Sequence, residues 1–172
     1  MAKESSKEIV VLSEREHILL RPTVYVGSVK STDEKVPLVR QERIIYEEKP
    51  ISVGMYKILN EVIDNSVDEA KRMKGKMKTI SISINPKTNS ATIKDTGNGF
   101  FKGTSINKDS GKTNIETAVS MLRAGSNFNN EEIEETLIGT NGMGVALTNV
   151  LSRRFKIVSV NETHYFEKEW ID

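Results

Sequence analysis

The sequence predicts an α+β fold made of helices and antiparallel hairpins. The first observation is an amphipathic helix over residues 55–73, where apolar residues recur at the spacing of one helix face and neither glycine nor proline intervenes. The second is a pair of alternating segments, 78–84 and 91–94, joined by turn-forming residues. The third is another alternating pair, 155–160 and 164–170.

Local signals place the remaining elements along the chain. Ser13 is a suitable N-cap for a short helix over residues 14–20, which must end before Pro22 because the residue preceding a proline avoids the helical region. Further along the chain we expect a turn at 21–27, a polar connection at 28–49 with an edge strand at 43–46, helices at 114–123 and 145–151, and a polar loop at 124–136.

Length and composition restrict the class of protein. A chain of 172 residues suits one domain with a sizeable core. The net charge of +1 is spread along the chain and indicates no direct nucleic-acid or membrane partner. Cysteine is absent, and His17 and His164 are too far apart in sequence to suggest a metal centre. No apolar run approaches membrane-spanning length, so we expect a soluble, cytoplasmic protein.

The long helix carries polar residues at the border of its apolar stripe. Glu61, Asn65 and Glu69 lie one turn apart, beside Ile58 and Val62. Acids and an amide at the edge of a buried stripe need paired partners or a ligand. The pattern therefore indicates a site, with a helix whose polar residues are only solvated as the alternative.

Two glycine-containing segments follow, each next to a predicted element. Residues 95–99 (Asp-Thr-Gly-Asn-Gly) end a strand, where the glycines permit a sharp turn beside a ligand or simply a tight turn with an Asx cap. Residues 139–144 (Gly-Thr-Asn-Gly-Met-Gly) open a helix, whose N-terminal amides are suited to phosphate. The second segment lacks the Gly-Lys-Ser/Thr of a Walker loop and the spacing of a dinucleotide fingerprint.

In this order the three motifs resemble those of the GHKL family of ATPases. Within that family, the chain resembles the ATPase domain of type IIA DNA topoisomerases over nearly all of residues 9–172. The Arg-Pro-x-x-Tyr-x-Gly turn at 21–27 is the most discriminating piece, and Asn127 stands where bacterial gyrase has lysine. The residues of these motifs are similar to those of the eukaryotic and T-even-type phage branch.

The resemblance implies a Bergerat fold, a two-layer sandwich of helices on a mixed, mainly antiparallel sheet. We expect a single ATP-binding domain over residues 1–172, with a loose arm at 1–12 and an ATP lid at 124–138. The family's last strand and its transducer domain, which carries a γ-phosphate-sensing lysine, lie beyond the point where the chain stops.

The resemblance also implies residue roles. Glu61 would be the general base that orients water against the γ-phosphate, and Asn65 would hold Mg²⁺. Asp95 would accept a hydrogen bond from the adenine amino group, with Gly99 leaving room for the ring. The other nucleotide contacts would come from Gly97, Ser126, Asn127, Gly139, Asn141, Gly142, Met143 and Gly144.

Two positions depart from the family. Asn98 stands where a cation normally pairs with the acid matched by Glu69, and Asn161 stands where bacterial gyrase has an arginine that binds aminocoumarins. Because both cationic contacts are replaced by asparagine, we expect weak novobiocin binding.

The resulting interpretation is the N-terminal ATP-binding module of a type IIA topoisomerase of phage type. ATP would drive homodimerisation of a gate that captures DNA, which is contacted through other domains or subunits of the parent enzyme. Because the transducer lysine is absent, we expect binding of Mg·ATP with little turnover from this polypeptide alone. The alternatives are a GHKL ATPase of another branch, against which the 21–27 turn argues, and a non-hydrolysing nucleotide-binding module, against which the retained Glu61 argues.

Overall fold

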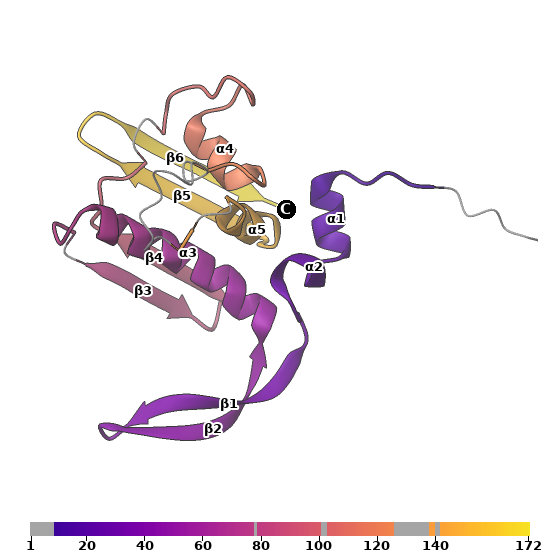
Figure 1. Ribbon diagram of the computed structural model, residues 1–172, viewed down its shortest axis with the longest axis vertical. Coiled ribbons are helices and arrows are strands. Elements are labelled where there is room, and N and C mark those ends of the chain that lie inside the picture. The colour runs from indigo at the N-terminus through magenta and orange to yellow at the C-terminus, as the bar shows by residue number, and fades with distance from the viewer. Residues whose placement is uncertain (1–8, 78, 101–102, 126–137, 140–141) are drawn as a thin grey trace, which may run out of the picture.

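The computed structural model describes residues 9–77, 79–100, 103–125, 138–139 and 142–172 (Figure 1). Helices and antiparallel strand pairs alternate along this part of the chain, so the α+β prediction is confirmed. The elements in chain order are α1 (Glu14–Leu20), α2 (Thr23–Val26), β1 (Ser31–Arg40), β2 (Arg43–Ser52), α3 (Val53–Arg72), β3 (Ile80–Asn85), β4 (Ser90–Asp95), α4 (Asn114–Ser120), α5 (Gly144–Val150), β5 (Arg154–Val160) and β6 (Tyr165–Ile171).

The strands form three hairpins, β1–β2, β3–β4 and β5–β6. All three pairs are antiparallel, so within the described residues the parallel pairing of a mixed sheet is not found. In Figure 1, α3, α4 and α5 lie over one side of the β3–β4 and β5–β6 hairpins, while β1–β2 extends away from the body. α3 packs on β4 and α5 packs on β5, which gives a helical layer over a strand layer.

The first helix begins where the sequence predicts. The Ser13 side chain accepts from Glu16 N–H, and the Glu16 carboxylate accepts from Ser13 N–H, which together form a capping box. The predicted turn at 21–27 contains one helical turn, α2, which ends at Gly27 with φ +80°. A positive φ favours glycine at this position.

The edge strand expected at 43–46 is confirmed as part of β2, but the rest of the polar connection expected at 28–49 is wrong. The structure instead has a hairpin in which ten residue pairs join β1 to β2. Its two-residue turn consists of Gln41 (φ +49°) and Glu42 (φ +62°), a backbone conformation that most often uses Asn-Gly. The sequence signal was missed because Gln-Glu is an unusual choice for this turn and the strands are rich in charge.

The hairpin β3–β4 lies where the alternation predicts it, and its isoleucine face is partly buried at Ile80 but becomes more exposed toward the turn. Ile82 is 49% exposed and Ile84 is 63% exposed. α3 packs on β4, which leaves the distal part of β3 outside this contact.

One cluster of the described core lies where the N-terminal helices meet α3 and α5. Ile18, Val26 and Leu147 are buried together, and partly buried Ile58 and Met143 pack against them. The amphipathic prediction for α3 therefore holds on its apolar side. The fully buried side chains of α3, however, are polar: Ser66 and Asp68.

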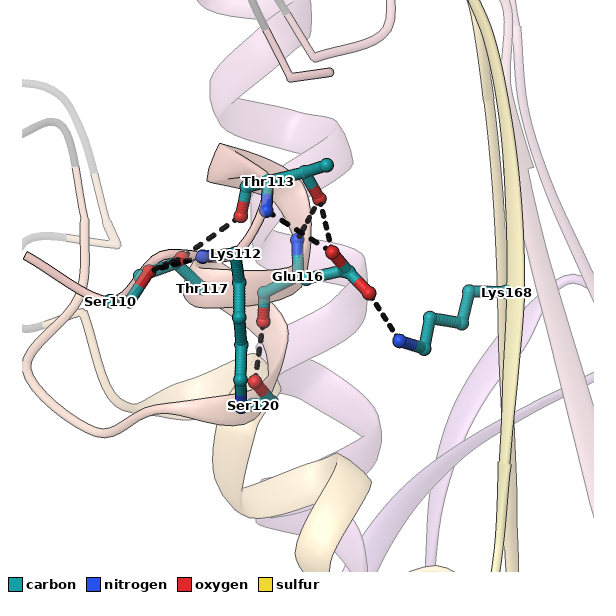
Figure 2. Close-up of polar contacts among 7 residues, drawn as sticks. All are labelled: Ser110, Lys112, Thr113, Glu116, Thr117, Ser120 and Lys168. Carbon is teal, nitrogen blue, oxygen red and sulfur yellow. Dashed lines mark hydrogen bonds and ion pairs between the residues drawn. The ribbon is translucent and has the colours of Figure 1, made fainter. Parts of the chain in front are cut away.

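Glu116 both completes the N-cap of helix α4 and connects this helix to the strand layer (Figure 2). Glu116 Oε2 accepts from Thr113 Oγ1 (2.8 Å) and Thr113 N–H (3.1 Å), and Glu116 N–H donates to Thr113 Oγ1 (3.2 Å). The other carboxylate oxygen of Glu116 pairs with Lys168 on β6. These contacts lower the pKa of Glu116 to about 2, with Lys168 as the largest cause and Thr113 next.

Candidate functional site

Polar residues on α3, which carries the first sequence motif, contact the other two motifs. Glu61, Asn65 and Asp68 follow one another at spacings of four and three residues, so they lie along one face of the helix. On the adjoining face, Ser66 contacts Asp95 at the end of β4, and Glu69 contacts Asn98 in the turn that follows. α3 is therefore the element on which the motifs meet.

Glu61 lies directly against the start of α5. A Cβ added at Gly144 would lie 2.8 Å from Glu61 Cγ and would overlap the carboxylate, so only glycine permits this approach. Thr148 Oγ1 donates to Ile58 O (2.8 Å) and holds the two helices together one turn away. The structure thus brings two predicted site residues, Glu61 and Gly144, into contact.

The Glu61 carboxylate also forms an ion pair with Lys57, one turn earlier on α3. The sequence reasoning did not assign this partner, although an acid four residues after a lysine on a helix is a familiar signal.

Asn65 is exposed, and one of its two polar atoms already has a partner. Asn65 Nδ2 donates to Glu61 O (2.7 Å), which directs the amide. The Cβ position of Gly139 lies 3.7 Å from Asn65 Oδ1, so the backbone before α5 runs beside this oxygen. Oδ1 is the atom with which Asn65 would bind a metal ion.

Asp68 is a site residue that sequence reasoning missed. Its side chain is buried, with only 2% of the residue exposed, and it accepts from Ile138 N–H (2.9 and 3.1 Å) and Gly139 N–H (2.8 Å). Lys71 Nζ lies 3.6 Å from Asp68 Oδ1. The signal that could have found it is its position seven residues after Glu61, which continues the line of Glu61 and Asn65.

Asp95 is held at the end of β4 by two contacts. Buried Ser66 donates its hydroxyl to Asp95 Oδ2 (2.7 Å), and Gly97 N–H donates to Oδ1 (2.9 Å). The second contact is the Asx turn weighed from the sequence, and the first fixes the carboxylate against α3. Ser66 was not identified from the sequence, because a serine inside a helix carries no distinctive signal.

Glu69 has a cationic partner, contrary to the expectation from Asn98. Arg72 Nε donates to Glu69 Oε2 (3.2 Å) from one turn further along α3, and the backbone N–H of Asn98 donates to Oε1 (3.2 Å). A Cβ at Gly97 would lie 2.6 Å from Glu69 Cγ, so Gly97 permits this close approach. The chain thus supplies the charge from the same helix instead of from position 98.

Gly99 is required by a neighbouring strand. It has φ +65°, and an added Cβ would lie 2.7 Å from Val160 O and 2.8 Å from Ser159 Oγ. Phe100 N–H also donates to Ser159 Oγ (2.9 Å). The contact with β5 accounts for glycine at position 99 without any ligand, so the predicted role of leaving room for a ring stays a prediction.

Contacts with Ala124 and with the core hold the two residues before α5, Gly142 and Met143, in place. Gly142 has φ +58°, and its carbonyl accepts from Ala124 N–H (3.2 Å). Met143 is the N-cap of α5 and packs on the core. Ser126, Asn127 and Asn141, together with residues 126–137 of the expected lid, lie outside the described residues.

The acids on α3 give the site a negative field. The pKa of Asp64 is raised, first by burial and then by the nearby charges of Glu61 and Asp68. Lys57 and Lys71 oppose this shift from either end of the row. A polyphosphate would need a cation to approach this face.

Two kinds of feature are absent from the described residues. No group of three or more histidine, aspartate and glutamate side chains is arranged to hold a metal ion in the described part of the chain. Among the helices that the structure describes, none combines the length and apolarity needed to cross a membrane.

Comparison with known proteins gives a consistent set of relatives. No family model matches the chain. DNA topoisomerase 2 of Drosophila melanogaster is 33% identical over 163 residues, which are 92% of this chain and 11% of the relative. DNA topoisomerase 2 of Caenorhabditis elegans is 34% identical over 165 residues, with 92% and 10% covered. The chain thus spans about a tenth of the length of the curated relatives it matches.

Solved structures agree with these relatives. The ATPase region of Saccharomyces cerevisiae topoisomerase II superposes with a TM-score of 0.86 at 25% identity, covering 95% of this chain and 43% of that one. The ATPase and transducer domains of DNA topoisomerase II from Balamuthia mandrillaris give a TM-score of 0.86 at 28% identity, with 95% and 42% covered.

Proposed function

Because this chain is homologous to the ATPase region of type II DNA topoisomerases over nine-tenths of its length, we propose that it binds Mg·ATP on the face of α3 that carries Glu61, Asn65 and Asp68. One observation carries the proposal: α3 contacts both predicted glycine motifs. Glu61 meets Gly144 on one side, and Ser66 holds Asp95 on the other. A ligand bound along this face of α3 could contact both motifs at once, as a nucleotide would.

In this proposal Asp95 recognises the base. Its carboxylate is fixed by Ser66 and Gly97, so it is oriented before a ligand arrives. Preorganised acceptors bind without an ordering cost. The phosphates lie toward α5, where amides of Gly142, Met143 and Gly144 would donate to them, with Ser126, Asn127 and Asn141 as further predicted contacts.

The residues present fit a magnesium ion. Mg²⁺ prefers oxygen ligands and is bound by one or two protein groups together with substrate phosphates. Asn65 offers one amide oxygen, because its nitrogen is directed to Glu61 O. When bound, the ion would neutralise phosphate charge beside the acids of α3.

Glu61 is the proposed general base. From α3 its side chain reaches the start of α5, beside the segment that would hold the phosphates. A carboxylate in this place can orient a water molecule. We propose that turnover by this polypeptide alone is low and that ATP binding closes a dimer of the parent enzyme around DNA. The parent enzyme's other domains or subunits would bind the DNA, and we place the protein in the cytoplasm, which would be that of the host cell if the protein is viral.

One contact favours a second candidate, a nucleotide-binding module that does not hydrolyse ATP. The ion pair with Lys57 occupies the Glu61 carboxylate, so a water molecule would have to compete with this cation for it. A module of this kind would bind nucleotide and pair with a topoisomerase subunit.

Titration with a non-hydrolysable ATP analogue, with and without Mg²⁺, tests the proposal by calorimetry and light scattering. We expect binding at one site per chain that depends on Mg²⁺. Dimerisation on binding favours the gate, whereas binding without dimerisation favours the module. A folded protein that does not bind the analogue would overturn both, and robust steady-state hydrolysis by the chain alone would overturn the expectation of low turnover.

A further inference from the structure

We infer that Asp68 is a positioning residue for the nucleotide site: its buried carboxylate fixes the backbone of Ile138 and Gly139 beside Asn65. This inference rests on the proposed function. The sequence motifs did not assign a role to Asp68, and it lies on a different face of α3 from Ser66, which holds Asp95.

The geometry requires a carboxylate at this position. Ile138 N–H lies within hydrogen-bond distance of both oxygens of Asp68 (2.9 and 3.1 Å), and Gly139 N–H donates to Oδ2 (2.8 Å). Asparagine offers only one oxygen, and its NH₂ group would face a backbone donor. The amide replacement therefore loses at least one hydrogen bond and leaves a donor poorly paired in a buried place.

The partners of Asp68 explain why its buried charge is tolerated. Only 2% of the residue is exposed, and a buried charge is stable only when it is paired and hydrogen-bonded. The two backbone amides and Lys71, at 3.6 Å, meet this need. The carboxylate is thereby committed to the backbone and does not stand as an uncompensated charge toward a polyphosphate.

We call the hydrogen bonds from Ile138 and Gly139 to Asp68 the clamp, and the backbone that it holds lies beside Asn65. The Cβ position of Gly139 is 3.3 Å from Asp68 Oδ2 and 3.7 Å from Asn65 Oδ1, so Gly139 packs between the two side chains. Its N–H is directed at Asp68, so this amide acts in positioning, and the proposed phosphate contacts begin at Gly142. A shift of Gly139 would move the segment leading to Gly142 and Gly144.

The test compares Asp68→Asn with Asp64→Asn, a matched control one turn earlier on the same side of α3. Both changes remove one negative charge near the site. Within the described part of the chain, hydrogen bonds to the backbone of 138–139 come from Asp68 and not from Asp64. A purely electrostatic effect would strengthen polyphosphate binding in both variants, whereas loss of positioning weakens it only in Asp68→Asn.

Amide hydrogen exchange of Ile138 and Gly139 in the nucleotide-free protein is measured first. We expect exchange at least tenfold faster in Asp68→Asn than in the wild type, and unchanged exchange in Asp64→Asn. Equal protection in the wild type and Asp68→Asn would overturn the inference. If Asp68→Asn does not fold, as judged by circular dichroism, Asp68→Glu takes its place, and undiminished protection in that variant also counts against the clamp.

Calorimetric affinity for the Mg²⁺ complex of the non-hydrolysable ATP analogue is measured second. We expect Asp68→Asn to bind at least tenfold more weakly than the wild type, and Asp64→Asn to bind equally or more tightly. Equal or tighter binding by folded Asp68→Asn overturns the inference while the proposed function stands. A wild-type chain that binds no analogue removes the proposed function instead, and the exchange result then decides whether the clamp exists.

Discussion

Glu116→Gln should destabilise the protein in a way that depends on pH. In the folded chain the Glu116 carboxylate caps α4 through Thr113 and pairs with Lys168 on β6 (Figure 2). Its pKa is about 2, against an ordinary value of 4.5. A group whose folded pKa is lowered stabilises the fold above its unfolded pKa, and this contribution is lost as pH falls through the folded pKa.

The size of the effect follows from these contacts. At about 1.36 kcal/mol for each pH unit, the shift corresponds to an upper bound of about 3.4 kcal/mol. The Glu116 side chain is 17% exposed but that of Lys168 is 43% exposed, so solvent screens the larger of the two causes. A capping contact of about 1 kcal/mol and a screened ion pair of about 0.5–1 kcal/mol give an expected loss of about 1.5–2 kcal/mol at pH 7.

Urea unfolding of the wild type and Glu116→Gln at pH 7, 5 and 3 measures this loss. The difference in the free energy of unfolding should be full at pH 7, slightly smaller at pH 5 and reduced to less than about half at pH 3, because the contribution is lost between the unfolded pKa and the folded pKa of Glu116. A Lys168→Met variant and the double variant isolate the ion pair. A difference of the same size at all three pH values would refute the reasoning, since a neutral packing effect does not titrate.

Three further predictions concern the site. Gly144→Ala should weaken binding of the Mg·ATP analogue at least tenfold by calorimetry, since its Cβ would displace the Glu61 carboxylate; unchanged affinity would show that this carboxylate moves freely. Lys57→Met should change the free energy of unfolding by less than about 1 kcal/mol in urea, because its ion pair with Glu61 is half-exposed; a larger loss would contradict this estimate. Novobiocin should bind weakly, since the Asn161 side chain accepts from Thr163 N–H and His164 N–H in its own turn, and sub-micromolar affinity in calorimetry would disagree.

The sequence predicts most of the helices and two of the three hairpins. The helix α1 and its cap follow from Ser13 and Glu16, and α3 follows from its apolar spacing. The β1–β2 hairpin could not be predicted, because its strands are mostly exposed and Gln41-Glu42 carries no usual turn signal. Hairpins of this kind are specified by pairing over their whole length, which periodicity does not report.

The candidate site was predicted in outline but not in its supporting contacts. The contact of Glu61 with Gly144 joins two predicted motifs that lie far apart in sequence. Ser66, Asp68 and Arg72 act through side chains aimed at distant backbone or at acids, and only the folded chain shows these distances. Long-range polar contacts therefore mark the limit of what spacing alone can indicate.

Because the residues that contact both glycine motifs all lie on α3, this helix is sensitive to insertions and deletions. One residue gained or lost within α3 between Glu61 and Glu69 would rotate everything beyond it by about 100°, and would change where Glu61 lies relative to the turn that begins at Asp95. The tip of the β1–β2 hairpin, at Gln41 and Glu42, carries no such constraint. Chains descended from a common ancestor should therefore differ in length at the hairpin tip while keeping the residue count of α3 constant.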